Sequence, residues 1–192
     1  MSIAAVRTKV GTLAKPIDPT LEQAPRIGWR AYLPTLAVAP LIAALDQLSK
    51  VVIADLLDER PGQALWVIEP LLRLRLVHND GIVFGIFSGA LSSWVTILFV
   101  LAALAAVIAI FLRYLRQPTL LARIVLGCII GGAAGNLIDR FRLGHVVDFV
   151  DLGWWPVFNL ADSAINVSMV VLVVLVMFGK LERDPQALPP TA

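Results

Sequence analysis

The stretch WVTILFVLAALAAVIAIFL, residues 94–112, decides the fold class of this chain. It contains 19 residues and no charged side chain. A helix of that length extends about 28 Å, close to the roughly 30 Å hydrocarbon core of a bilayer. The whole chain is similar in character, because 58% of its 192 residues are hydrophobic, 16% are charged and its mean hydropathy is +0.82. Soluble domains average about 45–50% apolar and about 25% charged residues, so the sequence predicts an integral membrane protein.

Three further segments are long and apolar enough to be membrane helices: residues 32–54, 120–138 and 161–178. Basic residues concentrate in the cytoplasmic segments of membrane proteins. With the N-terminus inside, 10 of the 16 basic residues are cytoplasmic, 5 lie outside and one, Lys50, lies within a span. We therefore expect a multi-pass protein with both termini in the cytoplasm.

Two outer segments connect these spans. Residues 55–91 include an alternation of apolar and basic side chains from Leu72 to Leu76, which is typical of a strand. Residues 140–160 are short and carry paired tryptophans, which suit the headgroup level of a membrane. The sequence thus predicts an all-α membrane protein of four transmembrane helices, with a small outer-face β platform in residues 55–91 and a short extracytoplasmic loop.

The ends of the chain are polar. Residues 1–30 lack the apolar core of a cleavable signal peptide, and three prolines interrupt them. We expect a disordered cytoplasmic leader over residues 1–30, one membrane domain over residues 31–180 and a cytoplasmic tail over residues 181–192.

The composition argues against several kinds of site. The single cysteine, Cys128, permits no intramolecular disulfide and is interpreted as a packing residue. With two histidines and no HExxH motif, a zinc protease site is not expected, and we predict neither a metal nor a cofactor. The basic residues form no single stripe, so we expect no nucleic-acid partner.

Two aspartates sit at the edges of membrane segments. Asp148 and Asp162 are 14 residues apart, too few to include another span, so both must lie at the same membrane boundary. A carboxylate near hydrocarbon costs about 2.5–3.5 kcal/mol. Two adjacent carboxylates can share a proton and act as acid and base on water. Taken singly, Asp148 could be an interfacial acid and Asp162 a helix-start residue; as a pair they predict an aspartyl hydrolase.

Other polar residues cluster at this boundary. Asp46 and Lys50 are four residues apart on one helical face, and either form a simple salt bridge or brace a site. Asn136, Asp139 and Arg140 end the third apolar segment. Two asparagines, Asn79 and Asn159, complete the set of candidates, although Asn79 also fits an ordinary loop turn.

Five segments, in order along residues 33–178, resemble lipoprotein signal peptidase (signal peptidase II), a family of bacterial aspartyl proteases. These segments are DQLSK (46–50), NDGIVFG (79–85), GNLIDR (135–140), VVDF (146–149) and FNLAD (158–162). The resemblance implies that Asp148 and Asp162 are a catalytic dyad. It implies that the remaining seven polar residues bind substrate or support the dyad: Asn79, Asn136, Arg140, Asn159, Asp46, Lys50 and Asp139.

The resemblance also implies a reaction and a location. The family removes signal peptides from prolipoproteins that carry a diacylglyceryl-cysteine, cutting just before that cysteine. The expected partners are such a prolipoprotein, membrane lipid and globomycin-type inhibitors, and the expected state is a monomer. The enzyme would lie in the bacterial cytoplasmic (inner) membrane, with its active site near the outer face.

Two other functions compete with this interpretation. In a small transporter or channel, Asp46, Asp139 and Asp162 would line an ion path, but the polar residues gather at one boundary rather than at several depths. A non-catalytic assembly protein would tolerate the loss of both dyad aspartates. We further expect Asp151 to be a surface acid and residues 79–89 to form a mobile lid.

Overall fold

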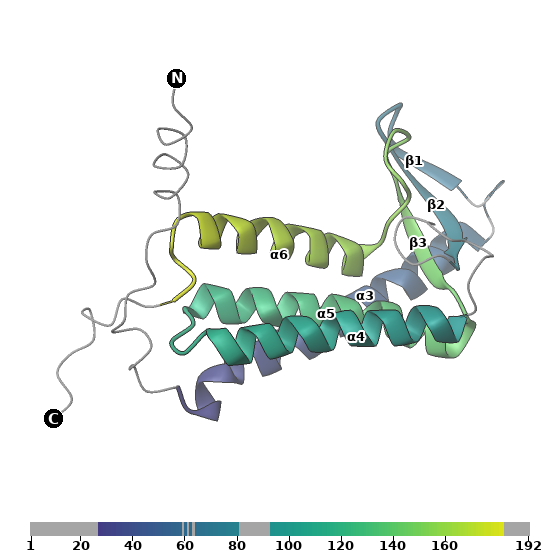
Figure 1. The fold of residues 1–192 in the computed structure, drawn as a ribbon. Helices are drawn as coiled ribbons and strands as arrows, with labels where there is room; N and C mark the ends of the chain where they lie inside the picture. The colour runs from purple at the N-terminus through teal and green to yellow at the C-terminus, as the bar shows by residue number, and fades with distance from the viewer. Residues whose placement is uncertain (1–26, 59, 61, 63, 81–92, 183–192) are drawn as a thin grey trace, which may run out of the picture.

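The computed structural model describes residues 27–58, 60, 62, 64–80 and 93–182. Four long helices run side by side, and a small sheet stands at one end of them (Figure 1). All four helices are long and apolar enough to cross a membrane. The elements in chain order are η1 (Trp29–Tyr32), α3 (Leu33–Asp58), β1 (Ala64–Ile68), β2 (Leu72–Asn79), α4 (Ser93–Tyr114), α5 (Leu120–Leu143), β3 (Val146–Asp151) and α6 (Leu160–Met177).

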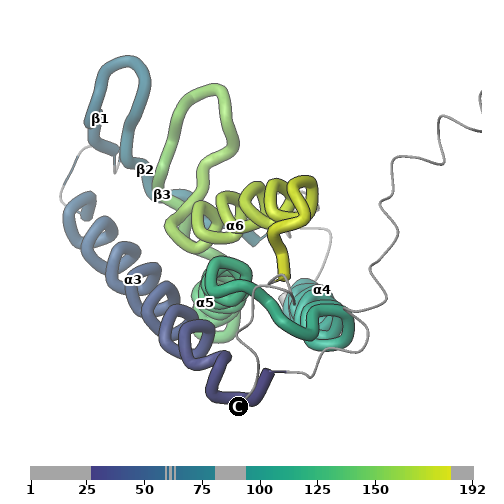
Figure 2. Tube along the Cα trace, turned by 90° about the vertical axis from the view of Figure 1, so that its left-hand side faces the viewer, coloured from purple at the N-terminus to yellow at the C-terminus, as the bar shows by residue number. Residues whose placement is uncertain are grey.

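Helix α5 is the centre of the bundle, between α3 and α6 (Figure 2). Of its 24 residues 14 are buried, against 4 of 26 in α3 and 3 of 18 in α6. Small residues bring the helices together, as is usual in lipid. A Cβ on Gly131 would collide with the carbonyl oxygen of Ala39 in α3, and one on Gly132 would lie 2.6 Å from that of Ala161 in α6.

The two ends of the bundle differ in chemistry. Far from the sheet, an apolar cluster of Phe111, Ala122, Leu126 and Leu175 fills the interior. Near the sheet, the interior of α3 and α5 holds charged and amide side chains instead, while leucines and valines cover the outside. A bundle with apolar side chains outside and polar ones inside suits a lipid environment, because lipid solvates the exterior and the polar groups must pair internally.

The sheet is antiparallel, in the order β1-β2-β3. In β2 and β3, Val77 pairs with Asp148 and Asn79 pairs with Val146, so this register sets Asn79 beside the strand that carries Asp148. The predicted β platform is therefore confirmed, but its third strand comes from the second outer segment, where no strand was predicted. Strand β3 has the sequence VVDFVD, which does not alternate regularly between apolar and polar residues. Both of its faces are largely covered, so neither face has to be polar.

Helix α5 is longer than predicted. It continues to Leu143, past the predicted end at residue 138, and Gly144 ends it with a left-handed backbone at φ 82°. Asp139 and Arg140 therefore lie in its last turns, where their neighbours fix both side chains. The helix can carry these charges because they face protein rather than lipid. Residues 1–26 of the predicted leader, 81–89 of the predicted lid and 183–192 of the predicted tail lie outside the described residues.

Candidate active site

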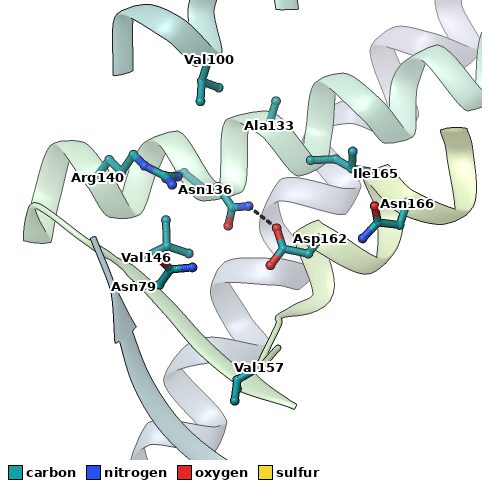
Figure 3. Close-up of a pocket in the computed structure, with 10 residues that line it drawn as sticks. All are labelled: Asn79, Val100, Ala133, Asn136, Arg140, Val146, Val157, Asp162, Ile165 and Asn166. Atoms are coloured by element: carbon teal, nitrogen blue, oxygen red, sulfur yellow. Dashed lines mark hydrogen bonds between the residues drawn. The ribbon is translucent and has the colours of Figure 1, made fainter. Parts of the chain in front are cut away.

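Asp162 is held at the first turn of α6 by a reciprocal cap. Asn159 is the N-cap residue, and its side-chain oxygen accepts a hydrogen bond from the Asp162 N–H at 2.9 Å. In return, Asp162 Oδ2 accepts from the Asn159 N–H at 3.3 Å. This capping box satisfies two backbone donors that a helix start leaves open. It also fixes the direction of the Asp162 carboxylate, whose Oδ1 accepts from Asn136 Nδ2 at 2.8 Å (Figure 3).

Asp148 projects from β3 and is 1% exposed. Its Oδ1 accepts a hydrogen bond from Asn159 Nδ2 at 2.7 Å, and its Oδ2 accepts from Asn79 Nδ2 at 2.9 Å. Asn159 therefore contacts both aspartates, Asp148 through its amide nitrogen and Asp162 through its amide oxygen. The structure brings the two acids predicted from sequence to one asparagine.

The environment of Asp148 places its titration near neutral pH. Burial raises the pKa of Asp148 to about 7, and the negative charge of Asp162 acts in the same direction. Hydrogen bonds from Asn79 and Asn159 and the charge of Lys50 oppose this rise. A carboxyl group of that pKa can change its protonation state at physiological pH, as acid–base chemistry requires.

Asn136 connects Asp162 to a buried ionic cluster. Its side-chain oxygen accepts from Asn159 Nδ2 at 3.0 Å and from Lys50 Nζ at 3.2 Å, while its nitrogen donates to Asp162. An amide oxygen accepts two hydrogen bonds. The oxygen is thus fully used, which fixes the amide orientation so that Asn136 must present its N–H to Asp162.

Lys50 occupies the middle of that cluster. Its Nζ lies 2.7 Å from Asp46 Oδ2 and 2.8 Å from Asp139 Oδ2, and all three side chains are at most 5% exposed. Asp46 Oδ1 accepts from the Ala161 N–H at 2.9 Å, and Asp139 Oδ2 accepts from the Val147 N–H at 3.1 Å. The salt bridge predicted between Asp46 and Lys50 is present. The cluster also anchors the first turn of α6 and the start of β3, the two elements that carry Asp162 and Asp148.

A cavity of about 150 Å³ adjoins these residues. Figure 3 shows its two ends. The end near the sheet is polar, with the amides, Asp162 and Arg140, which is 6% exposed and donates to the Asn136 carbonyl at 3.4 Å. Farther along the helices the lining is mainly apolar. The lining residues are Asn79, Val100, Ala133, Asn136, Arg140, Val146, Val157, Asp162, Ile165 and Asn166.

The prediction that Asp151 is a surface acid was wrong. Asp151 is 3% exposed and forms salt bridges with Arg73 at 2.7 Å and Arg75 at 2.9 Å. Burial alone would raise its pKa, but the Gly153 N–H and the two arginines outweigh burial, so the pKa of Asp151 lies below its usual range. The alternating arginines of β2 were the available signal, since Arg73 pairs directly with Asp151 across the sheet.

Two other features of the site were not predicted. Gln47 Nε2 donates to Asp139 Oδ1 at 2.8 Å and to the Gly135 carbonyl at 3.1 Å, and so completes the ionic cluster. The rings of His78 and His145 lie 4.4 Å apart, centroid to centroid. Burial and the charge of His78 lower the pKa of His145.

Across the described ranges no group of three or more His, Cys, Asp or Glu side chains is placed to hold a metal.

Comparison with known proteins identifies the family. The model of the signal peptidase (SPase) II family matches residues 38–178. The chain belongs to the signal peptidase II family. It is 42% identical over 157 residues to the lipoprotein signal peptidase of Moorella thermoacetica, covering 80% of this chain and 100% of that protein. It is 44% identical over 146 residues to that of Syntrophomonas wolfei, covering 74% of this chain and 93% of that protein.

Solved structures agree with this signal peptidase II fold. A bacterial membrane enzyme determined at 1.9 Å superposes with a TM-score of 0.63 and 27% identity, covering 74% of this chain and 91% of that one. Another, at 2.3 Å, gives a TM-score of 0.66 at 24% identity, covering 82% and 93%, and supports the fold alone. The predicted family and enzyme class are confirmed: this chain is a multi-pass membrane protease that removes signal peptides from prolipoproteins.

Proposed function

We propose that Asp148 and Asp162 are the catalytic dyad of this signal peptidase II, cutting diacylglyceryl-modified prolipoproteins just before the lipidated cysteine. The observation that carries the proposal is the bridge through Asn159, which hydrogen-bonds Asp148 at 2.7 Å and accepts from the Asp162 N–H at 2.9 Å. One asparagine thus holds both carboxylates, that of Asp148 through its side-chain amide and that of Asp162 through its backbone N–H, next to a cavity. Two acids placed in this way are arranged for shared acid–base work on water.

The chemistry follows from the different protonation states of two coupled acids. The ionised aspartate removes a proton from a water molecule as that water attacks the carbonyl carbon of the scissile bond. The protonated aspartate donates a hydrogen bond to the carbonyl oxygen, which gains negative charge, and a proton then passes to the leaving amine as the C–N bond breaks. The dyad titrates in two macroscopic steps that belong to the pair, and one of them lies near the pKa of about 7 of Asp148.

The surrounding residues then position substrate and dyad. Asn79, Asn136 and Arg140 line the cavity and are proposed to hold the peptide backbone, since orientation supplies a large part of enzymatic rate. Asn159 fixes both acids. The cluster of Asp46, Lys50 and Asp139 is proposed to act indirectly. It holds Asn136 and the starts of α6 and β3 in place. The reaction as proposed requires no metal or cofactor.

The same proposal includes the placement of the enzyme. The two-to-one excess of basic residues supports cytoplasmic termini in a bacterial inner membrane, with the sheet and the dyad at the outer face. Exposed Trp154 and Trp155, at 77% and 43%, suit the headgroup level beside that sheet. We further propose that a single subunit is active, that membrane lipid surrounds it and that globomycin-type inhibitors bind at the cavity.

A cleavage assay tests the proposal. The purified enzyme in detergent is incubated with a diacylglyceryl-modified prolipoprotein, and the products are identified by mass. We expect cleavage before the lipidated cysteine, lost in Asp148→Asn and in Asp162→Asn. Asp58→Asn, an exposed acid at the end of α3, is the matched control and should cut at the wild-type rate. Cleavage that survives in either dyad variant would remove that residue from the proposal.

A further inference from the structure

Asn166 is a polar residue on a membrane-spanning helix, and the catalytic proposal does not use it. After Ser163, α6 contains only two polar residues, Asn166 and Ser168. Ser168 is 4% exposed and packed inside the protein, whereas Asn166 is exposed and lines the cavity. In the described part of the chain, the Asn166 side chain has no hydrogen-bond partner. An amide without a partner is costly in hydrocarbon, so its presence at the cavity wall calls for a ligand.

The position of Asn166 relative to the dyad defines what it can reach. It follows Asp162 by four residues, about one helical turn or 6 Å along α6, on the side away from the sheet. Figure 3 shows Asn166 and Asp162 on the same side of the helix, facing the same cavity. A group bound by Asn166 therefore lies about one turn deeper in the membrane than the bond that Asp162 acts on.

The lining beside Asn166 indicates the chemistry of that group. Figure 3 shows Ile165 of α6 and Ala133 of α5 as the apolar lining residues on the Asn166 side of the cavity, while Val100 of α4 lies across from Asn136. Peptide groups would find their partners at the opposite, polar end. An acylated glycerol has a carbonyl acceptor where its polar part meets its hydrocarbon chains, which matches one amide donor in an apolar lining.

We infer that Asn166 donates a hydrogen bond to an ester carbonyl of the substrate's diacylglyceryl group, and so contributes to recognition of the lipid. The inference rests on the proposed function, because the lipidated cysteine must lie next to the dyad for its glyceryl esters to reach Asn166. The bond forms to a part of the substrate that does not react. Its loss should therefore raise KM and leave kcat unchanged.

The test compares two lipopeptides of identical peptide sequence, one with ester-linked and one with ether-linked chains. The ether substrate keeps the hydrocarbon and lacks both carbonyl oxygens. Losing one hydrogen bond to a neutral acceptor should lower kcat/KM about three- to tenfold. We expect that loss for wild type on changing from ester to ether. Leucine is similar in size to asparagine. The kcat/KM of Asn166→Leu should fall below that of wild type by the same factor on the ester substrate, and should equal that of wild type on the ether substrate. Val167→Leu, 64% exposed and outside the cavity lining, is the matched control and should resemble wild type.

Two results would overturn the inference. If Asn166→Leu cuts the ester substrate with the wild-type KM, the amide binds nothing that matters for recognition. If the kcat/KM of Asn166→Leu falls equally on the ester and the ether substrate, the partner of Asn166 is not an ester carbonyl. Asp162→Asn in the same assay separates the two proposals, because an active Asp162→Asn enzyme would refute the dyad, whereas an inactive one leaves Asn166 to be judged on its own result.

Discussion

Replacing Lys50 by methionine tests the buried ionic cluster. Lys50 Nζ is the shared partner of Asp46 and Asp139, at 2.7 and 2.8 Å, and it also donates to Asn136. Methionine keeps the length of the side chain and removes its charge, which leaves two carboxylates that are at most 4% exposed without their cation. Breaking a buried ion pair from one side costs about 3–5 kcal/mol. We therefore expect the free energy of unfolding to fall by about that amount.

The assay is reversible unfolding in mixed micelles, with the denaturing detergent fraction as the variable. Lys180→Met is the matched control: this lysine is exposed beyond the end of α6, and its loss should change the free energy by less than about 0.5 kcal/mol. Lys50→Met should also lower kcat in membranes where it still folds, because Asn136 loses a partner that fixes its amide toward Asp162. A Lys50→Met protein within 0.5 kcal/mol of wild type would refute the reasoning.

Three further predictions concern other parts of the site. A Cβ on Gly135 would lie 2.5 Å from Asp46 Oδ2, so Gly135→Ala should displace that carboxylate and lower the free energy of unfolding by about 1–3 kcal/mol; unchanged unfolding would contradict the close approach. Asn79→Leu removes an amide that stabilises the ionised form of Asp148 and should move the ionisation of kcat/KM near pH 7 to higher pH; a shift to lower pH would contradict that contact. Asp151→Asn should cost about 1 kcal/mol of stability at neutral pH, a modest value because the arginines it faces are 35% and 40% exposed. Since folding lowers the pKa of Asp151, its contribution exists above the ordinary carboxyl pKa and disappears as pH falls through the lowered value, so the two proteins should converge in acid.

The helices and the candidate acids could be predicted because each depends on local sequence. An uncharged run such as residues 94–112 has few alternatives to a membrane helix, and α4 is observed at Ser93–Tyr114. Asp148 and Asp162 were predicted as candidates because charge is costly at a membrane boundary, and their catalytic role stays a prediction. Their common contact with Asn159 agrees with the prediction that both lie at one boundary.

The remaining features depend on contacts between distant segments. Strand β3 was not predicted, because VVDFVD does not alternate regularly between apolar and polar residues. It forms a strand by pairing with β2. Asp151 was misjudged for the same reason, since its arginine partners are more than 75 residues away in the sequence. The extension of α5 to Leu143 follows from the burial of Asp139 and Arg140 against α3, α6 and the sheet, which a hydropathy pattern does not include.

The most direct test of the dyad is a comparison of single and double variants in single-turnover cleavage of a diacylglyceryl-modified prolipoprotein. Asp148→Asn, Asp162→Asn and the double variant are each purified, checked for wild-type folding and mixed in excess with substrate. If the two acids act as one unit through Asn159, each single change should lower the rate at least about a thousandfold, and the double variant should be no slower than the worse single one. Losses that multiply in the double variant, or a single variant that keeps most of the wild-type rate, would contradict a shared dyad.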